Sequence, residues 1–223
     1  MVARLSSSKL EDLADVIDSL HKTPKYSSQG VSMVRCVDLG YGPLNLDNTK
    51  SVDESVYLEY SRRYAPAKGD IIITRVGANF GVTSYVDETN FCLGQNTAAI
   101  VPKINPKYLY YILNSEKCRH QMSVLVAGAA QPTLSLKAIK ALDIPRLGKE
   151  LEDKIANVIG DINDKISVNQ KTNQTLEQMA QAFFKSWFVD FDPVFDNLLA
   201  SADFKLENLE TSLPDELKQK AQR

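Results

Sequence analysis

The sequence predicts a mixed α/β domain, in which short helices surround a twisted mixed sheet, followed by one long coiled-coil helix. Up to about residue 147, short β-branched or alternating runs are separated by turns that contain glycine and proline, a pattern typical of short strands. From Glu150 to Phe191 the apolar spacing becomes helical and stays so. At about 1.5 Å per residue this helix would be ~60 Å long, whereas a usual globular helix has about 11–12 residues. We therefore expect a domain at 1–147, a long spacer and dimerisation helix at 148–192, and an acidic tail at 193–223.

The most apolar strand is expected at Ile71–Val76, because its consecutive isoleucines are too apolar for a surface strand. Residues Gly77–Gly81 form a tight loop, after which Val82–Val86 returns as the partner strand. Gly94–Asn96 indicates a turn or bulge between two further strands. In all, strands are expected at 31–37, 71–76, 82–86, 91–93, 97–101 and 142–145.

Two capping patterns predict helices in the first 147 residues. Ser51–Glu54 has the form of a capping box, so a helix should begin there and end before Pro66. Asn105 followed by Pro106 predicts a second helix, with asparagine as its N-cap and proline in its first turn. Further short helices are expected at 116–124, at 136–141 and, in the tail, at 214–222.

The long helix carries an apolar seam with a period near 3.5 residues, which predicts that a second helix lies against it. Asn169 and Asn173 stand on the same seam, where polar residues select register and orientation because only one pairing lets their amides hydrogen-bond. A bend that leaves both amides in water is the alternative. The cluster around Phe183 and Trp187 is too apolar for an exposed end, so it should pack on its own domain, a second copy or another protein. The seam consists of Leu151, Ile155, Val158, Ile162, Ile166, Asn169, Asn173, Leu176, Phe183 and Trp187.

Composition limits the class of protein. Hydrophobic residues make up 43% of the 223 residues, enough for a packed core, and no run of about 18 apolar residues predicts a membrane span. The first residues lack the apolar stretch of a signal peptide, and three widely spaced cysteines fit a reducing cytoplasm. The net charge of −2 argues mildly against a protein that coats nucleic acid. Residues 1–147 nevertheless carry 17 Lys and Arg against 14 Asp and Glu, which permits a local basic face.

No catalytic constellation is found in the sequence. The two histidines, His21 and His120, have no plausible partner nearby, and neither a Walker loop nor a G-x-S-x-G motif occurs. Asn105–Tyr108 matches the Asn-Pro-x-Tyr tetrapeptide of amino-methyltransferases, but no glycine-rich cofactor turn precedes it, and a helix cap explains it better. Pro214–Lys218 matches pieces of a metal-dependent nuclease site, but its residues fall in one expected surface helix. We expect a non-catalytic chain without a metal site.

Three blocks, in this order, resemble one known family over about residues 9–192. Lys68–Gly77 resembles the central motif of the target recognition domain in the DNA-specificity (S) subunit of type I restriction–modification systems. Gly128–Ser135, followed by Leu142–Pro145, resembles the close of that domain. The helix with Ile159, Ile162, Ile166, Asn169 and Leu176 resembles the spacer helix of the family.

The resemblance implies a subunit that binds double-stranded DNA and recruits a methyltransferase (M) subunit and a restriction (R) subunit. Members usually carry two recognition domains and two antiparallel spacer helices, each domain reading one half of a split site. This chain has one of each, which suggests a half-subunit that dimerises through antiparallel helices or a truncated product. Cofactors of its own are not expected: S-adenosylmethionine, Mg²⁺ and ATP would bind only to the partner subunits.

Polar residues in the expected loops are the candidates for DNA contact. Arginine can give two hydrogen bonds to guanine, and asparagine or glutamine can pair with adenine, while other contacts go to phosphates. The alternative for each is an ordinary loop residue. An adaptor that binds only proteins, and a stand-alone methyltransferase or nuclease, are the rival functions. The candidates are Lys22, Thr23, Tyr26, Thr74, Arg75, Asn79, Gln95, Asn96 and Gln131.

Overall fold

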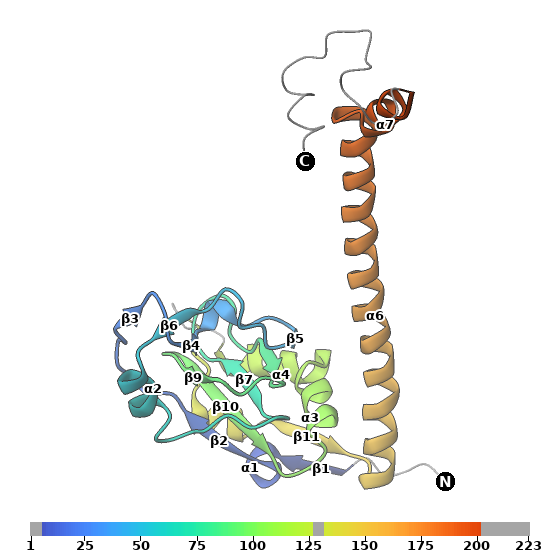
Figure 1. The fold of residues 1–223 in the computed structure, drawn as a ribbon. Coiled ribbons are helices and arrows are strands. Elements are labelled where there is room, and N and C mark those ends of the chain that lie inside the picture. Colours follow the sequence, from blue (N-terminus) through green and yellow to red (C-terminus); the bar gives the residue numbers. More distant parts are fainter. Residues whose placement is uncertain (1–5, 127–131, 202–223) are drawn as a thin grey trace. The chain divides into compact units, whose positions relative to one another are not determined.

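The computed structural model describes residues 6–126 and 132–201, apart from the side chain of Phe195. The chain forms two compact units, Met1–Asp161 and Ile162–Arg223. The first unit is a mixed α/β domain that also holds the first turns of the long helix, as Figure 1 shows. The predicted fold class is confirmed.

A five-stranded sheet in the order β2-β10-β7-β8-β5 forms the centre of the first unit. All its neighbours pair antiparallel except β5 and β8, which are parallel. The strand β7 is buried along its whole length, as its run of isoleucines predicts. In sheet order the five strands are Ala14–Asp18, Thr97–Pro102, Ile71–Thr74, Thr83–Tyr85 and Gly42–Pro43.

The remaining strands form two smaller sheets, where a single sheet was predicted. Four strands pair in the order β3-β6-β4-β9, with β4 and β9 parallel, and β1 pairs antiparallel with β11. The turn at Gly94–Asn96, where Asn96 has a φ of 65°, carries the chain from the four-stranded to the five-stranded sheet. These strands are Tyr26–Ser27, Lys50–Val52, Val31–Val34 and Phe91–Leu93 in the four-stranded sheet, and Ser6–Lys9 and Asp143–Arg146 in the two-stranded sheet.

Short helices connect these strands. The Asn105 cap is confirmed, since its side chain accepts a hydrogen bond from the backbone of Tyr108. The capping box at Ser51 is wrong: Ser51 and Val52 pair in β6, and α2 begins at Glu54 with no side-chain cap from Asp53. The helices are α1 Leu10–Leu13, a 3₁₀ turn Cys36–Asp38, α2 Glu54–Tyr60, α3 Pro106–Leu113, α4 Glu116–Val126 and α5 Leu136–Lys140.

Among the described residues, apolar side chains form one core layer on each face of the five-stranded sheet and a smaller cluster between α2 and the four-stranded sheet. Ile71 and Ile73 point into one layer, together with side chains of α1, α3, α4 and α5. Ile72 points into the other, together with Phe91 and Tyr64. Because successive side chains of a strand face opposite ways, a central strand between two apolar layers must be apolar throughout. This requirement explains the three consecutive isoleucines.

The long helix α6 spans Lys149–Phe184 and continues as a π-helical turn, Lys185–Val189. The chain breaks direction at Phe191, where φ is 50°, and forms α7, Asp192–Ser201, so the predicted helix ends slightly early and the tail begins with an unpredicted helix. The helix expected at 214–222 lies outside the described residues. Among the residues that the structure describes, no helix is long and apolar enough to cross a membrane.

In its first turns, α6 packs through a face that differs from the predicted seam. Glu152, Ala156 and Gly160 are its buried residues, and Gly160 lies against the side chains of Lys107 and Tyr111 in α3. Glu152 accepts hydrogen bonds from Arg146 Nε (2.7 Å), Arg146 Nη2 (3.0 Å) and the backbone of Leu147 (3.0 Å). These contacts fix the start of the helix on the domain and leave the adjacent seam uncovered.

Candidate nucleic-acid interface

The loops that carry most candidate residues leave the same edge of the five-stranded sheet. Strands β2 and β7 end there and β10 begins there, because Ala98 pairs with Asp18 and Thr97 pairs with Thr74. The β2–β3 loop, the β7–β8 loop and the β9–β10 turn therefore start side by side. Three segments that are far apart in the sequence are thus brought to one edge of the domain.

The β2–β3 loop presents Lys22 and Thr23 at the surface, and Tyr26, the first residue of β3, is exposed as well. Lys22 Nζ lies 2.9 Å from Glu59 Oε1, and its backbone carbonyl accepts a hydrogen bond from the Tyr60 hydroxyl at 2.6 Å. An exposed ion pair of this kind contributes little to stability, so the lysine can exchange Glu59 for a phosphate at small cost. Tyr26 is 38% exposed, and Lys50 Nζ lies 4.6 Å from the centre of its ring.

The other two loops expose amide side chains. Asn79 and Asn96 are exposed and Gln95 is half-buried. The backbone of Asn96 accepts a hydrogen bond from the backbone of Arg75 at 2.8 Å, which ties the β9–β10 turn to the start of the β7–β8 loop. Two exposed amide side chains on loops joined by a backbone hydrogen bond are suited to reading base edges.

Thr74 and Arg75, predicted as DNA contacts, instead form hydrogen bonds and an ion pair inside the domain. Thr74 is fully buried, and its hydroxyl donates to the carbonyl of Asn79 and accepts from the backbone of Val82 at 3.1 Å. The side chain of Arg75 is only 11% exposed; it pairs with Asp18 and donates from Nε to the carbonyl of Leu134 at 3.2 Å. Both residues therefore shape the loop edge and cannot reach a DNA groove in this conformation. Gln131 lies outside the described residues.

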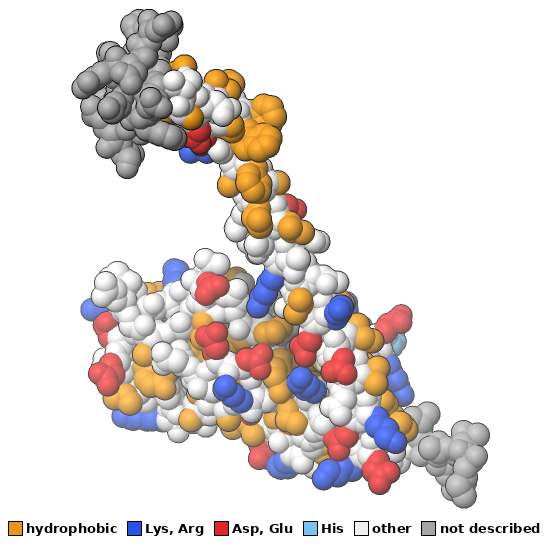
Figure 2. Space-filling model, turned by 45° about the vertical axis from the view of Figure 1, so that its right-hand side comes forward, with side chains coloured by type: hydrophobic (Ala, Val, Ile, Leu, Met, Phe, Trp, Pro, Cys, Tyr) orange, Lys and Arg blue, Asp and Glu red, His pale blue; other side chains and the backbone are white. Residues whose placement is uncertain are grey.

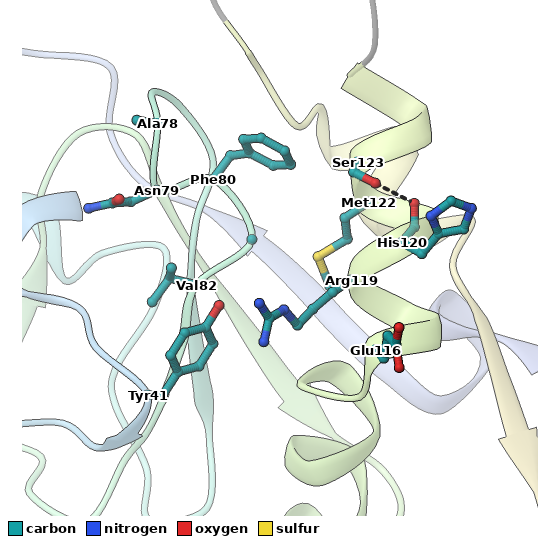
Figure 3. Close-up of a pocket in the computed structure, with 11 residues that line it drawn as sticks. Tyr41, Ala78, Asn79, Phe80, Val82, Glu116, Arg119, His120, Met122 and Ser123 are labelled. Atoms are coloured by element: carbon teal, nitrogen blue, oxygen red, sulfur yellow. Dashed lines mark hydrogen bonds between the residues drawn. The ribbon is translucent and has the colours of Figure 1, made fainter.

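A cleft of about 720 Å³ opens between the β7–β8 loop and helix α4. Figure 3 shows Arg119 of α4 pointing across it toward Tyr41, with Phe80 and the sulfur of Met122 also facing the gap. The guanidinium carbon of Arg119 lies 5.2 Å from the centre of the Tyr41 ring, a cation–π contact. The side chain of Asn79 points the other way, away from α4 (Figure 3).

Arg119 and Tyr41 were missed by the sequence reasoning. Tyr41 stands in a Gly-Tyr-Gly-Pro turn, and Arg119 in an ordinary helical pattern, so neither carries a local signal of function. Only the fold brings these two elements together across the cleft. An exposed arginine next to the β7–β8 loop is suited to contact a phosphate or a base.

The ionisable groups of the domain indicate structural roles. Burial raises the pKa of the Cys36 thiol, that of Cys92 to about 11 and that of Cys118 to about 12, so these cysteines are protonated at neutral pH and are poor nucleophiles. The hydrogen bond from Arg35 to Asp38 raises the pKa of Arg35 and stabilises the 3₁₀ turn after β4. Within residues 6–126 and 132–201, no three metal-ligating side chains gather closely enough to hold a metal ion.

Residues 7–178 match the family model described as the type I restriction modification DNA specificity domain. The chain belongs to this family. It is 34% identical, over 143 residues, to the type I restriction enzyme HindI specificity subunit of Haemophilus influenzae, a match that covers 61% of this chain and 31% of the relative. It is 30% identical, over 146 residues, to the MjaIX specificity subunit of Methanocaldococcus jannaschii, covering 65% of this chain and 33% of the relative. The chain thus spans about a third of these two curated relatives.

Solved structures share the fold. The S subunit of a type I restriction–modification system from M. genitalium superposes with a TM-score of 0.63 at 14% identity, over 92% of this chain and 50% of that one. A chain from a study of complex assembly in a type I system gives a TM-score of 0.53 at 18% identity, over 83% of this chain and 46% of that one. The resemblance inferred from three sequence blocks is therefore confirmed, and the adaptor alternative is not favoured.

Proposed function

We propose that this chain is a DNA-binding specificity subunit that reads one half of a two-part site. The observation that carries the proposal is the shared sheet edge, where loops with Lys22, Asn79 and Asn96 emerge together in a domain of the specificity family. Lysine would bind phosphates and position the domain, while the two amides would contact bases. Gln95 lies in the same turn as Asn96, and Tyr26 begins β3 directly after the β2–β3 loop.

A second copy of the chain would supply the other half of the site. The seam residues of α6 beyond the first unit are exposed, among them Ile162 at 55% and Leu176 at 56%. Figure 2 shows hydrophobic side chains gathered along this helix. Two such helices packed antiparallel would cover their seams and hold two reading domains a fixed distance apart. When two linked domains bind two half-sites together, the overall affinity exceeds that of either domain for its half-site alone.

The catalytic steps would belong to other subunits. The family places this domain in type I systems, so we propose a methyltransferase (M) subunit and a restriction (R) subunit as protein partners in the cytoplasm. S-adenosylmethionine, Mg²⁺ and ATP would bind to those partners and not to this chain.

Selection from a random duplex pool tests DNA reading. The wild-type chain should enrich duplexes with two half-sites in inverted orientation, and its affinity should fall as salt rises, because phosphate contacts release counterions. Asn79→Ala should lose discrimination at one base position by about 1–3 kcal/mol, the usual value of a bidentate base contact. Asn48→Ala, the same change at an exposed residue outside these loops, is the matched control. A pool that gains no sequence preference after repeated selection would refute the proposal.

A further inference from the structure

The exposed seam of α6 contains two asparagines that restrict how two copies can pair. Asn169 and Asn173 are exposed and lie near the middle of the seam, with Ile166 before them and Leu176 after them. A buried amide costs free energy unless another polar group pairs with it. The seam therefore carries a polar pair flanked by apolar residues on both sides.

We propose that two copies pair antiparallel in one register, with Asn169 of each chain facing Asn173 of the other about a dyad at Lys171. This inference rests on the proposed function, in which two chains pair through α6, and adds the register. The same register places Ile166 opposite Leu176, Ile162 opposite Ala180, and Ile159 opposite Phe183. Apolar residues thus meet apolar residues on both sides of the amide pairs, along the α-helical stretch 159–183.

Neighbouring registers break this match. A shift by one heptad in one direction places Asn169 against Ile166 and Asn173 against Ile162. The opposite shift places Asn173 against Leu176 and Asn169 against Ala180. Either shift would bury four amides per dimer without partners, since each chain contributes two. A mismatch of this kind is how polar seam residues select one register in coiled coils.

A parallel pair could also bring identical asparagines together, so the asparagines alone do not set the orientation. The charge distribution favours the antiparallel pair. Residues 149–170 carry three lysines against five acidic residues, whereas residues 171–189 carry two lysines against one glutamate. A parallel pair would place the acidic half beside itself, and an antiparallel pair places it beside the more basic half. Antiparallel packing also opposes the two helix dipoles, which is favourable.

The same register would cover the exposed aromatic side chains at the C-terminal end of the helix. Phe183, Phe184 and Trp187 are 61%, 61% and 58% exposed, although large aromatic side chains are rarely left in water together. In the proposed pair this end lies along the first turns of the partner helix. Those turns expose Leu151 and Val158 and leave Ile155 half-buried, beside the face that packs on the domain. The bulky end of one helix would thus cover the aliphatic end of the other.

Cysteine cross-linking tests the register directly on the full chain. The variant with both Ile166→Cys and Leu176→Cys should form a covalent dimer with a short thiol linker, because the two positions face each other across the pair. Either single variant should not, because like positions lie about 15 Å apart along the axis, at about 1.5 Å per residue. The variant with Ile166→Cys and Phe183→Cys is the matched control, since these two exposed seam positions face each other only after a one-heptad shift. The wild-type chain, treated in the same way, shows how much cross-linking comes from Cys36, the only native cysteine that is not buried.

Each outcome has a separate meaning. At least tenfold more cross-linked dimer in the Ile166/Leu176 variant than in the single and control variants supports the register. Cross-linking of a single variant would overturn it in favour of a parallel pair. A chain that sediments as a dimer but cross-links only in the control variant would overturn the register and leave the pairing of the proposed function intact. A chain that stays monomeric at all concentrations would overturn both.

Discussion

Replacing Ile162 and Leu176 by aspartate separates a pairing role of the long helix from a folding role. Both side chains are more than half exposed in the single chain, at 55% and 56%. Complete burial of such a side chain is worth about 1.5–3 kcal/mol, so covering the exposed half is worth about 1 kcal/mol. Four such side chains in a dimer give about 4 kcal/mol. At about 1.4 kcal/mol per factor of ten, their loss should weaken dimerisation by about 700-fold.

Sedimentation of the wild-type chain and of the double variant, over a range of concentrations, measures this change. The thermal unfolding midpoint of the domain should stay the same, because neither residue packs in the first unit. Val168→Asp is the matched control: Val168 is 59% exposed on the same helix but lies off the seam, so this variant should dimerise normally. A double variant that still sediments like the wild type would refute the idea that the seam joins two copies.

Two further predictions concern contacts inside the domain. Arg75→Ala should lower the free energy of unfolding by about 3 kcal/mol in urea titrations, because the largely buried Asp18 carboxylate loses its buried cationic partner and keeps only the exposed His21, 2.8 Å away; unchanged stability with weaker DNA binding would instead restore Arg75 as a DNA contact. Burial alone would raise the pKa of Glu152, but the hydrogen bonds from Arg146 and the backbone lower it below its usual 4.5, so this stabilisation is complete above about pH 4.5 and is lost as pH falls further. The difference in unfolding free energy between wild type and Glu152→Gln should therefore be largest at neutral pH and shrink in acid, and a difference that stays constant with pH would contradict this reasoning.

Local patterns predicted the elements whose cause is local. The isoleucines of β7 face two apolar layers, so burial on both sides was visible as an unbroken apolar run. Asn105 and Pro106 start α3 through their own side chains, which is why that helix was correctly placed. The length of α6 followed from sustained helical spacing.

The arrangement of the strands was not predictable in the same way. Strand β4 pairs with β9 in parallel, Met33 opposite Cys92, and no local pattern links segments so far apart. The helix start predicted at Ser51 was wrong because Ser51 pairs in strand β6, and this pairing takes precedence over the local capping-box pattern. Pairing between distant strands depends on the packing of the whole domain, so one sheet was predicted where three are found.

The candidate site was predicted to the level of loops but not of side chains. Asn79 and Asn96 are exposed, as a reading role requires, whereas Thr74 and Arg75 look equally polar in the sequence and are engaged inside the domain. Which polar residue is engaged depends on partners such as Asp18 and Leu134, which only the fold supplies. The position of Arg119 beside Tyr41 at the cleft is likewise set by the fold and not by a local sequence pattern.

A dimer that holds two reading domains a fixed distance apart should bind tightly only when its two half-sites have the matching separation. The most direct test is to take the duplex enriched by the wild-type chain and measure affinity while the gap between its half-sites is lengthened by one to five base pairs. About five base pairs is half a helical turn and places the half-sites on opposite sides of the duplex. The account predicts one preferred gap and, at five added base pairs, an affinity no higher than that for a single half-site. Equal affinity at every gap would contradict it.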